Sequence, residues 1–411
     1  MDLTRRAFAL GSLSLLGAAC SSGSPASRSS AAPVSKLVQV RSGTARRAAL
    51  GSLTASELAH AQRSFGVDLL GKVCAKGKNT TVSPASAALA LGLLTAGARG
   101  DTEKKLSAML HLPRWGDDVV AAYAAQHALL AGFRDQLQVA NRVYTANGST
   151  PDPATLDDAA TAFAAVLTQL DFAGDANGST ARINADVAKD TRDLIPKLFD
   201  DALDPSTLTV LVNAIHLKAD WSVPFEKEET RDTSFTTDTG DTVTVPMMHG
   251  GFGVYREDGG WRSVTLGYQK GRLEMVAILP PDSAGCDQLT SERLARLAHG
   301  ARDTYAGIAM PKLDLAQTHE LLDVLEGLGL PVSGDYSGYR CDTITQVVQK
   351  DVLKVDEKGT EAAAATGITM TLSARAPARD DVVLDRPYFL LLQDVAKGTP
   401  LFLSHVVDPT A

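Results

Sequence analysis

The sequence predicts a mixed α+β domain over residues 51–411, and three features of the chain lead to that expectation. The chain has 411 residues and is 44% hydrophobic, which is enough to bury a large core. Residues 54–73 place apolar side chains at helical spacing, with Leu58, Phe65 and Leu69 on one face. Near the C-terminus the apolar residues alternate instead, as in "TITQVVQKDVLKV" at residues 343–355, which is the period of a β-strand.

The start of the domain is marked by a helix signal and by the composition before it. Thr54 and Glu57 have the spacing of a capping box, in which each side chain bonds the other residue's backbone. Residues 20–50 are rich in Ser, Ala and Pro and lack apolar periodicity, so we expect a flexible tether there.

The first 19 residues have the layout of an export signal. A basic pair, Arg5-Arg6, precedes 13 mildly apolar residues, a stretch too short to span a membrane as a mature helix. The start "TRRAFAL" resembles a twin-arginine signal, and "LLGAAC" resembles a bacterial lipoprotein cleavage site, although Gly17 stands where that pattern usually has leucine. We therefore expect an exported protein, extracellular or held at the cell envelope, with Cys20 as the lipidated residue and only membrane anchor.

The net charge argues against some classes of binding partner, and the cysteine content limits the number of disulfides. Removing residues 1–19 takes away two arginines and one aspartate, so the net charge changes from −8 to −9. A chain this acidic is a poor binder of nucleic acid or anionic membranes. Besides Cys20 only Cys74, Cys286 and Cys341 remain, so at most one disulfide can form among them and stability must come mainly from the core.

The common signatures of enzymes are missing from the chain. It has no G-x-S-x-G, S-x-x-K or H-E-x-x-H sequence, and its eight histidines are scattered. "HGARD" and "HELLD" each pair one histidine with one acid and have no neighbour to complete a metal site. We expect neither enzymatic activity nor a cofactor or metal.

The most informative stretch is "VDEKGTEAAAATGITMTLSA", residues 355–374. The alanines alone would favour a short helix at residues 361–365, but the β-branched residues that follow oppose one. At period two, one face carries small residues first and apolar residues later: Thr360, Ala362, Ala364, Thr366, Ile368, Met370 and Leu372. The segment lies between two predicted core strands, 343–355 and 382–394, and beside a polar loop at 374–381. Such a segment can be exposed in one state and inserted into a sheet in another.

This stretch resembles the hinge of the serpins, the serine protease inhibitor family. Further segments match the family in order: "NTTVSPASAALALGLLTAGARGDT", "LVNAIHLKADWSVPF", "VPMM", "MPKL", "DYSGYR", "DRPYFLLL" and "PLFLSHVVDPT". The resemblance covers residue 50 to the end. It implies a bacterial serpin of the inhibitory type, with a central mixed β-sheet, two further sheets, eight or nine helices and an exposed reactive-centre loop.

The resemblance also implies a mechanism, suicide inhibition, and its residues. A serine protease would cleave the loop and become acyl-linked to it; the loop would then insert into the sheet of a metastable, monomeric inhibitor and trap the enzyme covalently. The family's functional positions fall on the following residues: Glu357, Gly359, Thr360, Glu361, Ala362, Ala363, Ala364 and Ala365 in the hinge, and Ser83, Ser86, Asn213, Trp221 and Gln349 in the regions where the sheet opens, called the shutter and breach.

The cleaved bond follows from the usual loop length of the family. Seventeen residues counted from Glu357 end on Ser373, which gives the reactive bond Ser373–Ala374 and favours elastase-like or subtilisin-like targets. Shorter or longer frames give Leu372 or Arg375.

Three positions depart from the family pattern, and one rival function stays open. Gln349 stands where serpins usually have histidine, Ser404 where they prefer glycine, and Tyr388 where they usually have phenylalanine. The alternative function is a non-inhibitory serpin acting as a carrier, chaperone or surface-binding module. Such members tend to have charged or bulky hinge residues, and the only charge in this hinge beyond Gly359 is Glu361.

Overall fold

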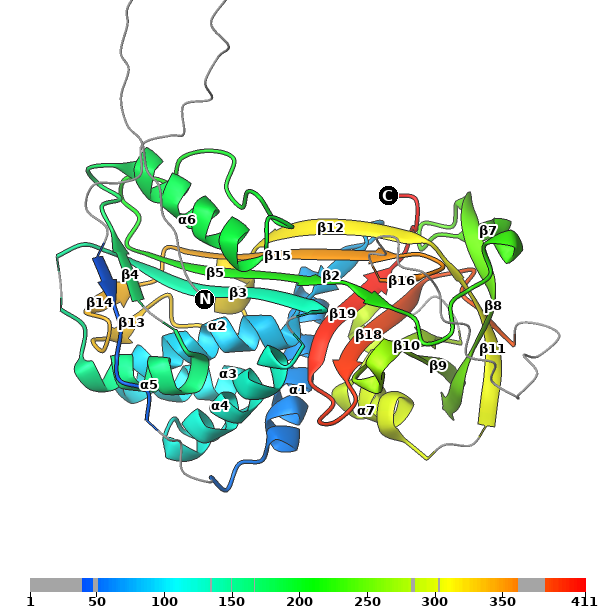
Figure 1. Cartoon of the computed structure of the whole chain (residues 1–411), viewed down its shortest axis with the longest axis horizontal. Helices are drawn as coiled ribbons and strands as arrows, with labels where there is room; N and C mark the ends of the chain where they lie inside the picture. The colour runs from blue at the N-terminus through cyan, green and yellow to red at the C-terminus, as the bar shows by residue number, and fades with distance from the viewer. Residues whose placement is uncertain are drawn as a thin grey trace, which may run out of the picture. The chain divides into compact units, whose positions relative to one another are not determined.

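The computed structural model describes residues 39–46, 51–133, 135–148, 150–165, 167–281, 285–301, 304–360 and 381–411 (Figure 1). The predicted export signal and Cys20 lie outside the described residues. So does the loop at residues 361–380, with Glu361, Ala362, Ala363, Ala364, Ala365, Leu372, Ser373, Ala374 and Arg375.

A mixed eight-stranded sheet forms the centre of the domain. Its path runs β1 (Gln39–Arg41), β4 (Leu167–Leu170), β3 (Leu137–Ala146), β5 (Thr209–Leu217), β15 (Gln346–Val355), β16 (Gly359–Thr360) and β6 (Ala219–Asp220), and β12 (Leu313–Glu320) pairs with the other side of β15. β5 and β15, which come from distant parts of the chain, lie next to each other in parallel.

A second sheet of nine strands and a two-stranded ribbon complete the β-structure of the described residues. The nine-stranded path is β17 (Val382–Val383), β11 (Thr304–Pro311), β8 (Thr242–Asp258), β9 (Trp261–Gly267), β10 (Leu273–Leu279), β18 (Tyr388–Asp394), β19 (Pro400–Val406) and β2 (Thr80–Val82), with β7 (Arg231–Thr236) paired to β8. The ribbon joins β13 (Ser333–Tyr336) to β14 (Cys341–Thr343).

Eight α-helices occur in the described part of the chain: α1 (Ala55–Val73), α2 (Pro84–Gly97), α3 (Gly100–Met109), α4 (Asp117–Ala131), α5 (Pro153–Phe163), α6 (Ala176–Asp190), α7 (Ser291–His299) and α8 (Leu322–Glu326). α6 lies on one side of β3 and β5, and α2 to α5 lie on the other (Figure 1). Each side has its own hydrophobic core, the larger one including α1 and α2 and the smaller one including α6. The predicted α+β class and the arrangement of sheets and helices are confirmed.

Local signals in the sequence explain several of these elements. Thr54 and Glu57 form the predicted capping box at the start of α1. Val347, Leu353 and Val355 all face the larger core from β15, as their alternation predicts. The apolar run at residues 382–394 is not one strand, however. It divides into β17 and β18, because the sequence Asp385-Arg386-Pro387 interrupts it and proline cannot donate to a sheet ladder.

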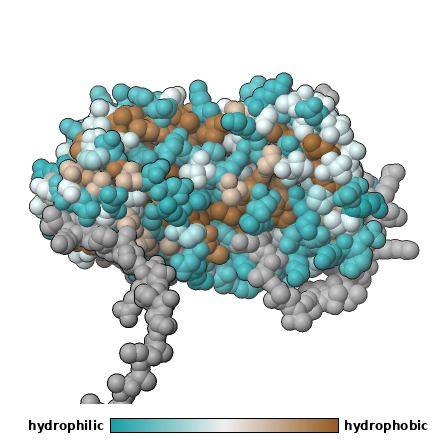
Figure 2. All heavy atoms as spheres, turned by 90° about the horizontal axis from the view of Figure 1, so that it is seen from above, coloured by the Kyte–Doolittle hydropathy of each residue, from teal (hydrophilic) through white to brown (hydrophobic). Residues whose placement is uncertain are grey.

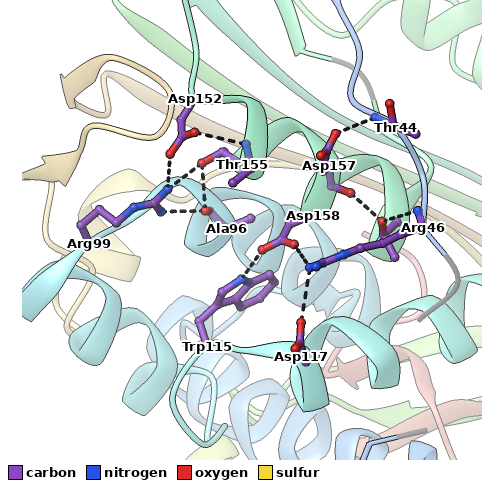
Figure 3. A network of polar contacts seen from close by, with 12 residues as sticks. Thr44, Arg46, Ala96, Arg99, Trp115, Asp117, Asp152, Thr155, Asp157 and Asp158 are labelled. Atoms are coloured by element: carbon purple, nitrogen blue, oxygen red, sulfur yellow. Dashed lines mark hydrogen bonds and ion pairs between the residues drawn. The ribbon is translucent and has the colours of Figure 1, made fainter. Parts of the chain in front are cut away.

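Residues 39–46 belong to the segment that we expected to be a tether, yet they pack on the domain (Figure 3). β1 pairs antiparallel with the edge strand β4. The backbone N–H of Thr44 donates to Asp157 on α5 at 2.7 Å, and Arg46 forms ion pairs with Asp158 and Asp117 at 2.5 and 3.4 Å. The segment therefore ties the sheet edge to α5 and to the start of α4.

The surface on the α6 side mixes hydrophilic residues with smaller hydrophobic areas (Figure 2). Among the described residues, the exposed large hydrophobic side chains are Val40, Leu194, Leu208, Val223, Tyr305 and Val395. Such single exposed side chains are ordinary on a protein surface. No helix in the described ranges is both long enough and apolar enough to cross a membrane.

Candidate functional site

A tight turn reverses the chain at the end of β15 and returns it to the sheet. The carboxylate of Asp356 accepts hydrogen bonds from the backbone N–H groups of Lys358 and Gly359, at 2.8 and 3.2 Å. Aspartate stabilises turns in this way because its short side chain reaches its own downstream backbone. Gly359 and Thr360 then form β16, which pairs antiparallel with β15 on one side and with β6 on the other.

Gly359 is required by the close approach of β6. A Cβ atom at this position would lie 2.1 Å from the carbonyl oxygen of Ala219 and 2.6 Å from the Cα of Asp220. Both neighbours are backbone atoms that cannot rotate away, so only glycine fits.

Thr360 is fully buried beneath an aromatic stack. Its hydroxyl lies 2.5 Å from the hydroxyl of Tyr268, whose ring stacks on Trp221 with centroids 4.4 Å apart. Trp221 in turn donates its indole N–H to the carbonyl of Asp356 at 2.9 Å and its backbone N–H to that of Lys358 at 2.7 Å. The hinge turn is thus bound to two aromatic residues that lie outside the central sheet's main strands.

Glu357, which lies in the same turn, anchors it through an ion pair and a hydrogen bond. Its carboxylate accepts from Lys312 Nζ at 3.0 and 3.2 Å and from the Thr230 hydroxyl at 2.8 Å. Burial alone would raise the pKa of Glu357, but the backbone, Lys312 and Thr230 outweigh it and lower the pKa. The carboxylate is therefore charged at neutral pH and anchors the turn to two further segments of the chain.

A buried cluster of amide and hydroxyl groups joins β5, β15 and α2 farther down the sheet. Gln349 donates from Nε2 to the Asn213 side-chain oxygen at 2.7 Å and to the Ser83 carbonyl at 3.2 Å. The Ser83 N–H donates back to Gln349 Oε1 at 3.3 Å, and Asn213 donates to the Ser86 hydroxyl at 2.5 Å. The structure thus brings together the four residues expected at the shutter, and it places Trp221 at the hinge.

The boundary between β5 and β15, which we call the seam, is closed over seven residue pairs, from Val210–Gln346 to His216–Val352. Beyond His216 the two strands separate. The space between their continuations is occupied by β16, since Thr360 pairs with both Ala219 and Val355. The two described hinge residues of β16 therefore occupy the open end of the seam.

A buried carboxyl group, that of Asp351, lies at the seam. Asp351 is only 1% exposed, and neither of its carboxylate oxygens has a hydrogen-bond partner among the described residues. In the alternation of β15 it shares the core-facing side with Val347, Gln349 and Leu353. Burial raises the pKa of Asp351 well above its ordinary value, because the charged form cannot be solvated there. The group is thus held in its protonated form as the pH rises through the range where an exposed aspartate ionises.

Several of these contacts could not be read from the motifs. Tyr268, Lys312 and Thr230 approach the hinge from distant segments. Lys312 belongs to the family segment "MPKL", but that segment does not indicate a contact with Glu357, and nothing in the local sequence of Tyr268 or Thr230 signals their role. Asp351 did carry a signal, because it interrupts the apolar alternation of 343–355 with a charge at an inward position.

Comparison with known proteins agrees with this geometry. Residues 60–409 match the family model described as serpin (serine protease inhibitor). The leukocyte elastase inhibitor of Bos taurus is 30% identical over 86% of this chain and 100% of its own.

Two solved structures show how widely the fold is shared. The thermophilic serpin tengpin in its native state has a TM-score of 0.74 at 22% identity, covering 90% of this chain and 97% of its own. Human thyroxine-binding globulin has a TM-score of 0.75 at 26% identity, covering 87% and 100%. With its central sheet, its hinge and a family match over most of its length, this chain belongs to the serpin family.

Proposed function

We propose that this protein inhibits serine proteases by loop insertion, with elastase-like or subtilisin-like enzymes as targets. The protease serine attacks the scissile carbonyl, the peptide bond breaks, and the new N-terminus leaves while the acyl-enzyme remains. The freed loop then enters the central sheet and displaces the enzyme before water can hydrolyse the ester. The result is a covalent complex of a distorted protease with the cleaved inhibitor.

The observation that carries the proposal is the pairing of β16 with two strands at once. An inserted loop must run antiparallel to both β5 and β15. Gly359–Thr360 already run antiparallel to β15 and to β6, the strand that follows β5 in the chain. Insertion therefore requires extension of an existing strand, and it needs no new nucleation. The seven β5–β15 residue pairs are replaced by two new ladders, so the sheet gains hydrogen bonds as the loop enters.

Continuing this register predicts the neighbours of each inward residue in the inserted state. Even-numbered loop residues would face the larger core, because Thr360 and Val355 are partners and Val355 faces inward. The predicted neighbours, on β5 and β15 respectively, are Leu217 and Leu353 for Ala362, Ile215 and Asp351 for Ala364, Asn213 and Gln349 for Thr366, and Leu211 and Val347 for Ile368.

The side chains along this path suit fast entry followed by stable burial. The alanines come first and can pass between strands, whereas a charged side chain would have to lose its solvation shell. Later, burying Ile368 and Met370 would contribute roughly 3–6 kcal/mol, at about 1.5–3 kcal/mol each. The uninserted protein is then a metastable state that persists for kinetic reasons.

Gln349 is compatible with sheet opening although the family usually has histidine there. Its amide both donates and accepts in the shutter, so one neutral side chain bridges Ser83 and Asn213. Thr366, which the register brings to this point, carries a hydroxyl that can replace one of those bonds after insertion.

The proposal also covers the location of the protein and the position of the cleaved peptide bond. We place the protein outside the bacterial cytoplasm as a monomer, tethered through a lipid on Cys20, and we place cleavage at Ser373–Ala374. Leu372 and Met370 beside that bond favour proteases with apolar or small specificity pockets.

The decisive experiment incubates the protein with trypsin-like, elastase-like and subtilisin-like proteases and follows complexes on denaturing gels. We expect a covalent complex that survives denaturation with at least one enzyme. Thr360→Arg should be cleaved without trapping the enzyme, because a guanidinium cannot be buried at the position between β6 and β15 from which the inserted strand must extend, while the matched Thr360→Ser keeps the hydroxyl and should inhibit.

Two results would oppose the proposal. Equal inhibition by Thr360→Arg and the parent would show that the hinge does not insert. Cleavage without any stable complex across the panel would favour the carrier or surface-binding alternative.

A further inference from the structure

Two cysteines and a histidine from three distant elements meet at one point of the domain. Cys74 caps the end of α1, Cys286 begins the short 3-10 helix η3 (Cys286–Gln288), and His405 lies on β19. The cysteines are joined as a disulfide. His405 Nδ1 lies 3.1 Å from Cys286 Sγ and 3.4 Å from Cys74 Sγ, and the three donor atoms are all within 4.8 Å of one another.

The histidine is held rigidly in this position. β19 is paired on both sides, with Phe389 of β18 and Thr80 of β2 opposite His405. The imidazole ring also stacks on Phe389, with centroids 4.4 Å apart and planes 16° apart. A ring held between two paired strands and against a stacked aromatic keeps its Nδ1 atom directed at the two sulfurs.

A cavity gives access to the group. It has a volume of about 370 Å³ and is lined by Cys74, Cys286 and His405 together with Lys76, Asp238 and Asp287. The Oδ1 atom of Asp238 is buried and has no hydrogen-bond partner among the described residues, although Oδ2 accepts from the Gly77 N–H at 2.9 Å. The cavity therefore adds carboxylates, and room for a solvent ligand, beside the two sulfurs and the imidazole.

We propose that Cys74, Cys286 and His405 bind a thiophilic divalent cation, Zn²⁺, once the disulfide is reduced. A dithiol reductant would supply two electrons and two protons, giving two thiols and a disulfide of the reductant. Zn²⁺ then replaces the two thiol protons and takes both thiolates and Nδ1 as ligands. Two cysteines, one histidine and an open fourth position form a known donor set for zinc.

In this proposal the oxidation state of the two cysteines decides which cross-link forms: a disulfide when they are oxidised, and a bound metal ion when they are reduced. The disulfide and the metal ion each join the end of α1 to η3, and the metal ion also binds β19 through His405. Sequence patterns could not predict it, because the ligands are 119 to 331 residues apart and no short spacing connects them.

Cobalt titration of the full chain tests this proposal, since tetrahedral Co²⁺–thiolate centres absorb visibly. The background is Cys20→Ser/Cys341→Ser, which leaves only the Cys74–Cys286 pair. After reduction with a phosphine and anaerobic desalting, we expect one Co²⁺ per chain, with thiolate charge-transfer and tetrahedral ligand-field bands that Zn²⁺ abolishes. We also expect Zn²⁺ to raise the melting temperature of the reduced chain.

Control samples distinguish a specific metal site from adventitious metal binding. The oxidised chain should give no thiolate band, because its sulfurs are bonded to each other. Adding Cys286→Ser should remove the band, and adding His405→Ala should weaken binding at least tenfold and change the ligand-field spectrum. Alkylating the reduced background chain should remove the band without any change of sequence.

Three results would overturn the proposal: no thiolate band in the reduced background chain, the same band in the oxidised chain, or a spectrum unaffected by His405→Ala.

Discussion

The buried carboxyl group of Asp351 gives the sharpest test of the closed sheet. Its oxygens have no partner among the described residues, and it faces the core beside Gln349. Replacing Asp351 with Val removes the polar group and keeps a side chain that suits a strand. We expect this change to stabilise the uncleaved protein, which is unusual for a substitution in a core.

The size of the effect follows from the cost of a buried unsatisfied polar group, about 1–3 kcal/mol. For a domain of this size, that corresponds to a rise in melting temperature of roughly 1–4 °C. Filling the extra volume of valine opposes part of this gain. Asp351→Asn, which matches the shape but keeps polar atoms, should therefore change stability less at acidic pH.

The pH dependence has a definite sign. The pKa of Asp351 is raised in the folded state, so its protonation stabilises the fold fully below the unfolded pKa, near 4. That stability is lost as the pH rises toward the folded pKa, by about 1.4 kcal/mol for each pH unit between the two pKa values. Asp351→Asn cannot ionise, so its advantage over the parent should grow from pH 5 to pH 8.

Other titratable groups near Asp351 must be considered in this comparison. On the core-facing side, Gln317 and His319 of β12 lie opposite Asp351 and Gln349, and Ile215 of β5 lies opposite Asp351; of these three only His319 can ionise. The elements α2 and β2 contain no ionisable residue. Burial lowers the pKa of His319, against an opposing hydrogen bond with the Thr81 carbonyl. This histidine is present in parent and variant alike, so their difference isolates Asp351.

Melting temperatures of the uncleaved parent, Asp351→Asn and Asp351→Val at several pH values between 5 and 8 give the measurement. Asp314→Asn is the matched control, because this aspartate on the adjacent strand β12 is 66% exposed and should leave the profile close to that of the parent. Parallel pH profiles for the parent and Asp351→Asn would refute the reasoning.

Three further predictions follow from the proposed insertion. Cleavage of the loop should raise the melting temperature by tens of degrees, because the energy of insertion is released; equal values before and after cleavage would exclude a stored-energy mechanism. Mass spectrometry of the released C-terminal peptide should show Ala374 as its first residue, whereas a peptide starting at Ala376 would point to cleavage after Arg375 by trypsin-like enzymes. Gln349→Leu should destabilise the uncleaved protein by about 1–3 kcal/mol in chemical denaturation, since Asn213 loses a buried donor, and an unchanged midpoint would argue against the shutter network.

The sequence by itself determined the family and much of the local structure. The capping box at Thr54, the alternation of β15 and the order of motifs from residue 50 onward are local or collinear patterns, which depend on neighbouring residues alone. Gly359 could be selected as a hinge residue because the motif places it. The reason that only glycine fits, the backbone of Ala219 and Asp220, appears only when β6 is in place.

Tertiary structure decided the features that join distant segments. Tyr268 reaches Thr360 across 92 residues, and Cys74 meets His405 across 331, separations at which no periodicity connects two positions. The attachment of residues 39–46 to β4 and α5 is of the same kind, because a polar segment acquires order only from the surface on which it packs. That Asp351 finds no hydrogen-bond partner among the described residues also depends on every element around it, since burial and hydrogen bonding are properties of the packed core.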